Sequence, residues 1–353
     1  MIELQEVLLQ AIERKGSDIY ILPGSPVLVK VSGKMEPLSE ERVLPADSER
    51  YLQEAYMLAL NRNMDRLLQT GDDDFSFSLQ KLGRFRCNTY RQRGTLAAVL
   101  RTVPFGLPDP AVLGIPQAVM DLYNTRRGMI LVTGPAGSGK STTLACVIDR
   151  INVNTFDHII TIEDPIEYLH PHKKSIVSQR EIMHDTESYG HALRAALRQA
   201  PDVILLGEMR DFETIQTALT AAETGHLLLS TLHTVGAAKT IDRVVDVFPA
   251  NQQQQVRIQL SMVLQAVVSQ QLIPTLDGGM VAAFEVMIVN SAIQNMIREG
   301  KVHQMDNVIY AGGSQGMITM DADLQRLYTQ KKISKDNALL FAVNPDILAK
   351  KLT

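Results

Sequence analysis

A glycine-rich segment followed by lysine and serine is the part of the chain whose residue types and spacing most clearly could do chemistry. Gly134, Gly139, Lys140 and Ser141 fit the pattern G-x-x-x-x-G-K-[ST], and the pattern lies between an apolar run and a helical pattern. In that context Lys140 can reach the β- and γ-phosphates of a nucleotide, and the Ser141 hydroxyl can coordinate Mg²⁺. The segment therefore predicts a phosphate loop made of Gly134, Pro135, Ala136, Gly137, Ser138, Gly139, Lys140, Ser141 and Thr142.

Acidic residues follow two further apolar runs and could organise Mg²⁺ and a water molecule. "IITIEDPIEY" presents Glu163, Asp164 and Glu167, and "VILLGEMRD" presents Glu208 and Asp211. Ligands of open α/β sheets bind at the carboxyl ends of the strands, so both groups should point toward the phosphate loop. The alternative for any one of these acids is a helix N-cap.

Glu163 and Glu208 are our candidates for the catalytic carboxylates and, with Ser141, for the metal site. Phosphate-loop proteins usually have an aspartate after the second apolar strand, whereas this chain has Gly207 and Glu208 there. The sequence does not decide which glutamate activates water and which organises magnesium.

Histidines flank the apolar run "HLLLSTLH". His233 at its end could contact the γ-phosphate, while a hydrogen-bonded structural histidine is the alternative interpretation for both His226 and His233. His170 and His172 in "HPHKK" are only weakly similar to a metal-binding pair, and we expect a solvated loop there.

Two arginines near the N-terminal third of the chain form the other candidate pair. If "RQRGTL" turns through Arg93 and Gly94, Arg86 lies opposite Arg101 on neighbouring strands. Like charges that face each other are unfavourable unless an anion lies between them. The pair could complete a nucleotide site as arginine fingers do, and two solvated edge arginines are the alternative.

The elements that must position these residues fall into two domains. Residues 1–101 read as a small α+β domain of mostly antiparallel sheet, because Leu4, Val7, Leu8 and Ala11 recur at helical spacing before a series of short strand patterns. We expect a second helix over residues 48–69 and strands over 74–79, 84–92 and 95–101.

The segment "VPFGLPDPAVLGIP" contains four prolines, so residues 102–116 are predicted to be an inter-domain linker and hinge. Beyond it, residues 117–353 alternate short apolar strands with helices, which is typical of a parallel sheet covered on both faces. The fold class is therefore α/β. A helix is expected to begin at "NQQQQ" and to continue through Val256, Leu260, Val263, Leu264 and Val267.

The composition limits which ligands the protein could bind and in which compartment it could lie. The formal net charge is -4 and no basic, aromatic-interleaved stretch is present, which disfavours nucleic acid as a ligand. Cys87 and Cys146 are the only cysteines, which fits a reducing compartment and excludes a four-cysteine zinc site. No apolar run approaches the roughly 18 residues of a transmembrane segment. We expect a soluble, cytoplasmic protein.

Several motifs together resemble those of the secretion-superfamily ATPases, and within them the type IV pilus retraction ATPases. "GPAGSGKST" is similar to their phosphate loop, with Ala136 where threonine is usual, and "ITIEDPIEY", "DVILLGEMRD" and "TGHLLLSTLHT" are similar to their Asp box, Walker B segment and His box. "AIQNMIREGKVHQM" resembles the retraction-type signature, with Gln294 where arginine is usual. The resemblance covers nearly the whole chain.

The resemblance implies a PAS-like first domain, a RecA-like second domain and a ring-shaped homohexamer that hydrolyses ATP with Mg²⁺. It also implies that Arg86 and Arg101 approach the nucleotide from the first domain. The expected function is to power type IV pilus retraction and twitching motility. The expected partner is an inner-membrane pilus platform protein, with the ATPase peripheral at the cytoplasmic face of that membrane.

The sequence is also compatible with two other kinds of function. A related pilus-extension or type II/IV secretion machine uses a similar ATPase core, although the extension-type relatives typically carry a longer N-terminal region and a four-cysteine metal site. A regulator that cycles with nucleotide but does no mechanical work is an alternative of a different class.

Overall fold

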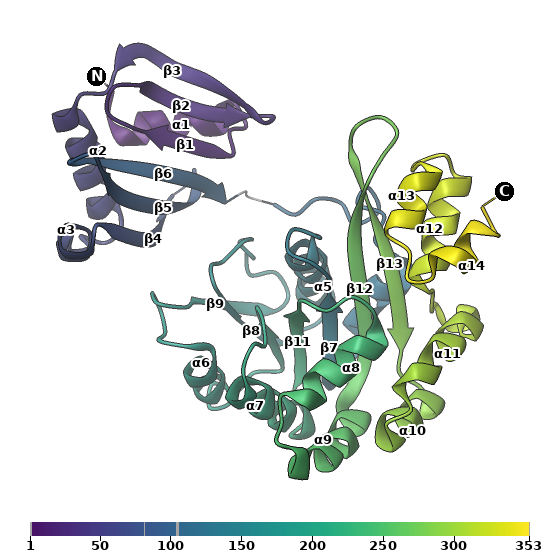
Figure 1. Cartoon of the computed structure of the whole chain (residues 1–353). Coiled ribbons are helices and arrows are strands. Elements are labelled where there is room, and N and C mark those ends of the chain that lie inside the picture. Colours follow the sequence, from purple (N-terminus) through teal and green to yellow (C-terminus); the bar gives the residue numbers. More distant parts are fainter. Residues whose placement is uncertain (1, 81, 104–105, 353) are drawn as a thin grey trace. The chain divides into compact units, whose positions relative to one another are not determined.

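The structure is a computed structural model that describes residues 2–80, 82–103 and 106–352 (Figure 1). The chain divides into two compact units. The first comprises Met1–Gly106 with Glu167–Leu169, and the second comprises Leu107–Ile166 with His170–Thr353.

The first unit is built on a six-stranded antiparallel sheet in the order β3-β2-β1-β6-β5-β4. Its strands are β1 (Asp18–Ile21), β2 (Pro26–Val31), β3 (Lys34–Arg42), β4 (Asp72–Leu79), β5 (Gly83–Gln92) and β6 (Thr95–Val103). Helix α1 (Leu4–Glu13) buries the four apolar residues whose spacing predicts it, namely Leu4, Val7, Leu8 and Ala11. They join a core that includes Phe75, Phe77 and Phe85 from the sheet.

The helix expected over residues 48–69 is wrong in its extent. Two helices occupy that region, α2 (Pro45–Leu58) and α3 (Asp65–Thr70). Leu60 and Asn61 between them have φ values of 58° and 57°, a left-handed conformation that ends a right-handed helix. The Asn63 side chain then accepts a hydrogen bond from the Asp65 N–H at 2.7 Å, at the start of α3.

The β5–β6 hairpin has the register that the sequence predicts. Arg93 and Gly94 form the turn with φ values of 47° and 79°, which matches the positive dihedrals of a two-residue hairpin turn. Arg86 consequently pairs with Arg101 across the two strands.

The predicted linker 102–116 overlaps with both units at its ends. Thr102 and Val103 are the last residues of β6, and Pro104 and Phe105 lie outside the described residues. Ile115 is buried in a core of the second unit. A hinge in this segment remains a prediction.

The second unit contains a seven-stranded sheet in the order β13-β12-β7-β11-β10-β8-β9, in which every neighbouring pair is parallel except β12 with β13. The strands are β7 (Gly128–Thr133), β8 (His158–Glu163), β9 (Ile176–Glu181), β10 (Val203–Leu206), β11 (Leu227–Leu232), β12 (Leu264–Pro274) and β13 (Met280–Ile288). The α/β fold class is confirmed, with a smaller antiparallel unit followed by a mostly parallel sheet.

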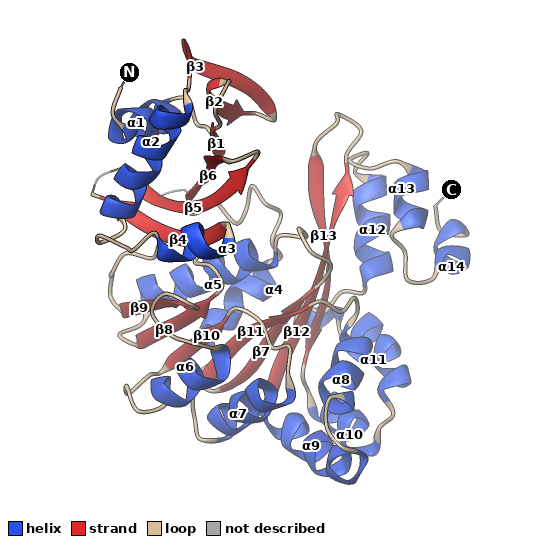
Figure 2. Cartoon of the chain, turned by 60° about the vertical axis from the view of Figure 1, so that its left-hand side comes forward, coloured by secondary structure: helices blue, strands red, loops and turns tan. Residues whose placement is uncertain are grey.

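Helices cover both faces of this sheet (Figure 2). Alternate residues of β7 enter two different cores: Met129 and Leu131 pack on one side, and Ile130 and Val132 on the other. One core is completed by α4 (Gln117–Met120), η1 (Asp121–Asn124) and α5 (Lys140–Asn154). The other is completed by α6 (Tyr189–Ala196), α7 (Phe212–Glu223), α8 (Ala237–Asp246), α9 (Ala250–Val263), α10 (Ser291–Glu299), η2 (Val302–Gln304) and α11 (Met305–Ala311).

The C-terminal helices pack beside the β12–β13 hairpin (Figures 1 and 2). They are α12 (Met320–Thr329), α13 (Lys335–Leu340) and α14 (Pro345–Ala349), and they follow the short η3 (Gly313–Gln315). Leu324 and Leu327 of α12 form a small separate core with Ile273 of β12 and Ala283 of β13.

The helix that begins at "NQQQQ" is shorter than its apolar pattern predicts. Helix α9 ends at Val263, and Leu264 and Val267 belong to β12. Leu264 has φ −66° and ψ 128°, and the following residues pair with β7 instead of continuing the helix. A buried strand and a buried helical face give similar apolar runs over a few residues, which explains the error.

Within the described residues, no helix combines the length and apolar character needed to cross a bilayer.

Candidate functional site

The phosphate-loop motif has the strand, loop and helix context that its sequence predicts. It connects β7, whose six residues are all buried, to the first turn of α5. Gly134, Gly137 and Gly139 have φ values of 142°, 74° and 87°. These conformations are costly for other residues, so the glycines let the backbone curl around the position where phosphate would bind.

Lys140 is folded into the loop. Its Nζ donates hydrogen bonds to the backbone oxygens of Gly134 and Pro135, both at 2.9 Å, and the residue is buried. These contacts hold the ammonium group at the N-terminus of α5, where the helix dipole also favours an anion.

Two hydroxyl groups at the loop suit an anionic ligand. Ser138 Oγ and Thr133 Oγ1 are buried, and neither has a hydrogen-bond partner among the described residues. Buried hydroxyl groups normally have a partner, because leaving one unpaired costs free energy. Phosphate oxygens would supply the missing acceptors, so the loop fits a nucleotide.

Glu163 lies at the carboxyl end of β8, as predicted. Its Oε1 accepts a hydrogen bond from Thr161 Oγ1 at 2.6 Å and another from Gln179 Nε2 at 3.3 Å. Thr161 and Gln179 lie on the neighbouring strands β8 and β9, so they fix the carboxylate from the sheet itself.

Glu208 and His233 come together just beyond the neighbouring strands β10 and β11. Glu208 Oε2 lies 3.4 Å from His233 Nε2 and 2.7 Å from Arg210 Nε. The Glu208 side chain is 12% exposed and that of His233 is 51% exposed. The histidine can therefore contact both this carboxylate and a ligand in solvent. His226, at the other end of β11, instead has its Nδ1 within 3.0 Å of the Ala221 carbonyl oxygen, as a structural histidine does.

Asp211 acts as a helix N-cap. Its Oδ1 accepts a hydrogen bond from the Thr214 N–H at 2.9 Å at the start of α7, and its Oδ2 accepts one from the Thr214 hydroxyl. Asp164 and Glu167 are exposed. Of the five acids at the strand ends, Glu163 and Glu208 thus remain the candidates for chemistry.

Gly207 and Tyr189 pack against each other in this region, a contact that no sequence motif predicts. A Cβ atom on Gly207 would lie 2.9 Å from the Tyr189 hydroxyl and 3.3 Å from the Ile162 carbonyl oxygen, which explains the glycine before Glu208. Burial raises the pKa of Tyr189, and the negative charge of Glu208 raises it further. In the sequence, the sign of this close packing is Gly207 itself, which stands just before Glu208.

Arg86 and Arg101 each already have a carboxylate partner in the first unit. Arg86 Nη2 lies 2.6 Å from Asp74 Oδ2, and Arg101 Nε lies 2.8 Å from Asp18 Oδ1. Burial acts to raise the pKa of Asp18, but the hydrogen bonds from Arg101 and Ser17 and the positive charges of Arg101 and Lys30 together outweigh it, so the net shift is downward. The repulsion expected between the two arginines is therefore relieved by aspartates within this unit.

Residues 171–174 of the "HPHKK" segment are exposed, as expected of a solvated loop, and only His170 departs from that expectation. His170 is buried, and burial lowers its pKa to about 4. His172 Nδ1 accepts a hydrogen bond from the Val177 N–H at 3.1 Å. Both histidines therefore pack or cap this loop.

Among the described residues, no three His, Cys, Asp or Glu side chains gather into a ready-made metal site. Magnesium commonly binds through one or two protein ligands together with substrate phosphates. Ser141 at the start of α5 and the carboxylates of Glu163 and Glu208 offer the oxygen donors that this mode uses, and their role as a magnesium site remains a prediction.

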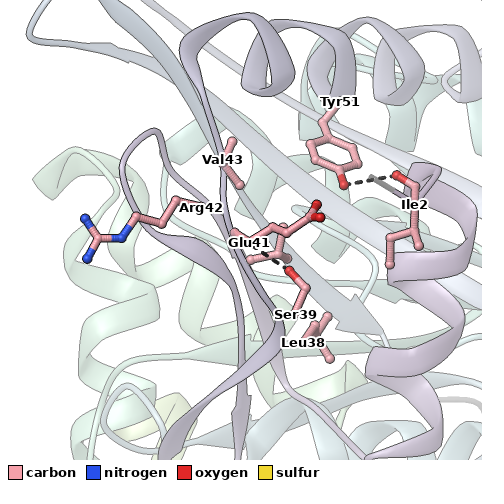
Figure 3. Close-up of a pocket in the computed structure, with 8 residues that line it drawn as sticks. Ile2, Leu38, Ser39, Glu41, Arg42, Val43 and Tyr51 are labelled. Carbon is pink, nitrogen blue, oxygen red and sulfur yellow. Dashed lines mark hydrogen bonds between the residues drawn. The ribbon is translucent and has the colours of Figure 1, made fainter.

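A cavity of about 310 Å³ lies in the first unit, where Tyr51 Oη donates a hydrogen bond to the Ile2 carbonyl oxygen at 3.0 Å (Figure 3). It is lined by Ile2, Val27, Leu38, Ser39, Glu41, Arg42, Val43 and Tyr51. None of the residues predicted for the nucleotide site lines it.

Comparison with known proteins agrees with this geometry. Residues 2–338 match the family model described as type II/IV secretion system protein. The type IV pilus retraction ATPase PilT of Pseudomonas aeruginosa is 45% identical over 340 residues, which cover 95% of this chain and 97% of the relative. A twitching motility protein of Neisseria gonorrhoeae is 46% identical over 324 residues, covering 91% of this chain and 86% of the relative.

Solved structures are similar over the same length. A crystal structure of the pilus retraction motor PilT with bound ADP superimposes with a TM-score of 0.91 at 47% identity, covering 99% of this chain and 100% of that one. The Legionella pneumophila ATPase DotB superimposes with a TM-score of 0.82 at 27% identity, covering 99% and 97%. The chain belongs to the type II/IV secretion system protein family, and its PilT-like relatives confirm the resemblance to pilus retraction ATPases.

Proposed function

We propose that this protein is a hexameric, Mg²⁺-dependent ATPase motor that powers type IV pilus retraction and hence twitching motility. The observation that carries the proposal is a phosphate loop with buried, unpartnered hydroxyl groups at Thr133 and Ser138, in a chain of the same family as PilT. The proposed partner is an inner-membrane pilus platform protein, which the ATPase would contact from the cytoplasmic face.

ATP is the proposed substrate. Residues 134–142 would bind its phosphates, with Lys140 exchanging the Gly134 and Pro135 carbonyl oxygens for phosphate oxygens. Bound Mg²⁺ would neutralise charge on the phosphates, with Ser141, Glu163 and Glu208 as its candidate ligands or second-sphere carboxylates. One of Glu163 and Glu208 would orient and activate the attacking water.

His233 and the two arginines would respond to the γ-phosphate. His233 lies beside Glu208 and is half exposed, so it can donate a hydrogen bond to a phosphate oxygen while it remains next to that carboxylate. Arg86 and Arg101 would exchange Asp74 and Asp18 for phosphate oxygens. Because hydrolysis and phosphate release remove that anion, the arginines would return to their aspartates, and this exchange of partners would link nucleotide state to movement of the first unit.

The test is made in the host organism. The gene is deleted and restored as wild type, as Lys140→Ala, or as Lys173→Ala, a matched control at a lysine whose ammonium group pairs with Asp149 at the protein surface. Surface pili are counted and surface motility is followed. The proposal predicts abundant pili without movement in the deletion strain, with rescue by wild type and Lys173→Ala and no rescue by Lys140→Ala.

Other outcomes identify a different function. Loss of surface pili on deletion would indicate an extension ATPase. Normal pili with a secretion defect would place the protein in a secretion machine, a function that the description of its family as type II/IV secretion system protein keeps as the second candidate. Normal pili, movement and secretion would indicate a regulator that does no mechanical work.

A further inference from the structure

Strand β12 runs beyond the point where its neighbour β7 ends. The two strands are paired up to Ser269 and Thr133, so the next residue of β12, Gln270, reaches the level of Gly134, where the phosphate loop begins. Gln270 is buried, with 4% of its surface exposed. A buried polar side chain in this place requires hydrogen-bond partners, and the first turn of α5 supplies one.

The main chain of β12 restricts the first residue of the loop. A Cβ atom on Gly134 would lie 2.1 Å from the Gln270 carbonyl oxygen, closer than two atoms can approach without displacement. Gly134 is therefore required by its contact with β12 as well as by its φ of 142°. Strand β12 and the phosphate loop are packed against each other without space for a side chain.

The side chain of Gln270 contacts the opposite end of the loop. Its Oε1 accepts a hydrogen bond of 2.7 Å from the Thr143 hydroxyl in the first turn of α5, which orients the amide. Its Nε2 then faces Gly139, where a Cβ atom would lie only 2.9 Å away. The amide nitrogen therefore lies beside the residue that precedes Lys140, with no room for a side chain between them.

The chemistry of an amide suits this place better than that of a carboxylate. The N-terminus of α5 carries partial positive charge that favours an anion, and a neutral amide with its donor toward Gly139 leaves that charge intact. A glutamate would have the same length and could still accept the Thr143 hydrogen bond, but it would add negative charge beside the loop. The residue type is therefore matched to a loop that binds phosphate.

We propose that Gln270 is a positioning residue for the nucleotide site, which acts through Thr143 and Gly139 to hold the phosphate loop in the shape that binds a nucleoside di- or triphosphate. The proposal rests on the proposed function, because it requires that residues 134–142 bind nucleotide. It adds a residue outside the loop that no sequence motif of the site includes.

Gln271 provides a matched control on the same strand. Its Nε2 donates a hydrogen bond to the Phe341 carbonyl oxygen at 3.2 Å, on the side of the C-terminal helices. Removing the Gln271 amide perturbs β12 one residue away and leaves the contacts of Gln270 with Thr143 and Gly139 in place.

The experiment measures the Kd of full-length protein for ADP by calorimetry, and the melting temperature without nucleotide, for Gln270→Glu, Gln270→Met and Gln271→Ala. Gln270→Glu should raise the Kd by about tenfold or more through added negative charge. Gln270→Met should raise it by only about threefold through the lost Thr143 contact. Gln271→Ala should bind ADP as the wild type does, whatever its melting temperature.

The results separate the inference from the proposed function. If wild type fails to bind ADP, the proposed nucleotide site is wrong. If wild type binds and Gln270→Glu binds within about twofold of it, or if Gln271→Ala loses as much affinity as Gln270→Glu, the role of Gln270 is contradicted.

A second set of variants decides the question if Gln270→Glu does not fold. Thr143→Val and Gln270→Met both remove the hydrogen bond between these two side chains, and Gln270→Met also removes the amide beside Gly139. Both should raise the Kd for ADP, and the double variant should raise it no further than Gln270→Met alone. Additive effects, or no effect on the Kd, would overturn the proposal.

Discussion

Arg86 lies directly opposite Arg101 in the β5–β6 register, and each guanidinium is held by its own aspartate, Asp74 and Asp18 respectively. Both arginines are substantially exposed, at 38% and 67% of their side-chain surface. The Arg86–Asp74 pair is exposed on both sides and contributes little to stability, so Arg86 can exchange its aspartate for another anion at small cost. The Asp18 carboxylate is only 9% exposed, so its pairing with Arg101 stabilises the fold more. The arrangement places two positive charges opposite each other on neighbouring strands.

The role of Arg86 and Arg101 can be tested by measuring the unfolding free energy and the ATP turnover of their variants separately. Arg86→Ala should change the free energy of unfolding by less than about 1 kcal/mol, because its ion pair with Asp74 is exposed. Arg101→Ala should destabilise the fold more than Arg86→Ala does, because it leaves the buried Asp18 carboxylate without this partner. Each should lower ATP turnover at least about tenfold if the guanidinium stabilises charge at the γ-phosphate. Arg91→Ala is the matched control, since Arg91 is an exposed arginine of β5 whose side chain donates to the Leu68 carbonyl oxygen. Equal turnover in all three variants would show that Arg86 and Arg101 are ordinary surface residues.

Asp211 and Glu208, three residues apart, should respond in opposite ways. Asp211→Ala removes the N-cap of α7 and should cost about 1 kcal/mol of unfolding free energy, while turnover of the folded protein stays near wild type. Glu208→Gln should leave stability nearly unchanged and lower turnover about a hundredfold or more. Urea unfolding and a phosphate-release assay measure the two quantities, and loss of turnover in Asp211→Ala at a temperature where it is folded would contradict the N-cap role.

The two thiols should be unreactive in the folded protein. Burial raises the pKa of Cys146 to about 11, and burial also raises the pKa of Cys87. Since the thiolate is the reactive form, little of it is present at pH 8. A chromogenic disulfide reagent should therefore label neither thiol until the protein is unfolded, when both react. Rapid labelling of native protein that disappears in Cys146→Ala would show that this thiol is accessible.

His170 should make stability fall as the pH decreases. Burial lowers its folded-state pKa to about 4, whereas an unfolded histidine titrates near 6.5. Between these values the unfolded chain binds a proton that the folded chain does not, so the contribution is complete above about pH 6.5 and is lost as the pH falls toward 4.

His170→Leu removes this titrating group. Its unfolding free energy should decline less than that of wild type between pH 7 and pH 5, by roughly 1–2 kcal/mol. Urea unfolding at both pH values measures the difference. An identical decline in the two proteins would mean that His170 is accessible to protons in the folded state.

Much of the fold and of the phosphate loop follows from local sequence patterns. The spacing of Leu4, Val7, Leu8 and Ala11 predicts α1, and Arg93–Gly94 predicts the turn that brings Arg86 opposite Arg101. The loop from Gly134 is predictable because its glycines, lysine and serine are each required by phosphate chemistry at fixed spacing.

The remaining features depend on contacts between distant segments. The apolar pattern predicts that the first residues of β12 continue a helix, because a few buried strand residues have the same apolar character as a helical face. The strand is specified instead by its pairing with β7. For the same reason the sequence does not place Gln270 beside Gly134, Tyr189 beside Gly207, or Asp74 and Asp18 beside the two arginines. The break after α2 depends on the left-handed conformations of Leu60 and Asn61, which no strong turn motif marks.

The central claim is that the phosphate loop binds and hydrolyses ATP through Lys140. The most direct measurement is the rate of phosphate release from Mg-ATP by purified wild type, Lys140→Ala and the surface control Lys173→Ala, with the melting temperature of each recorded. We predict that Lys140→Ala folds but releases phosphate at about 1% of the wild-type rate or less, while Lys173→Ala is unaffected. Turnover by Lys140→Ala at the wild-type rate would contradict the claim.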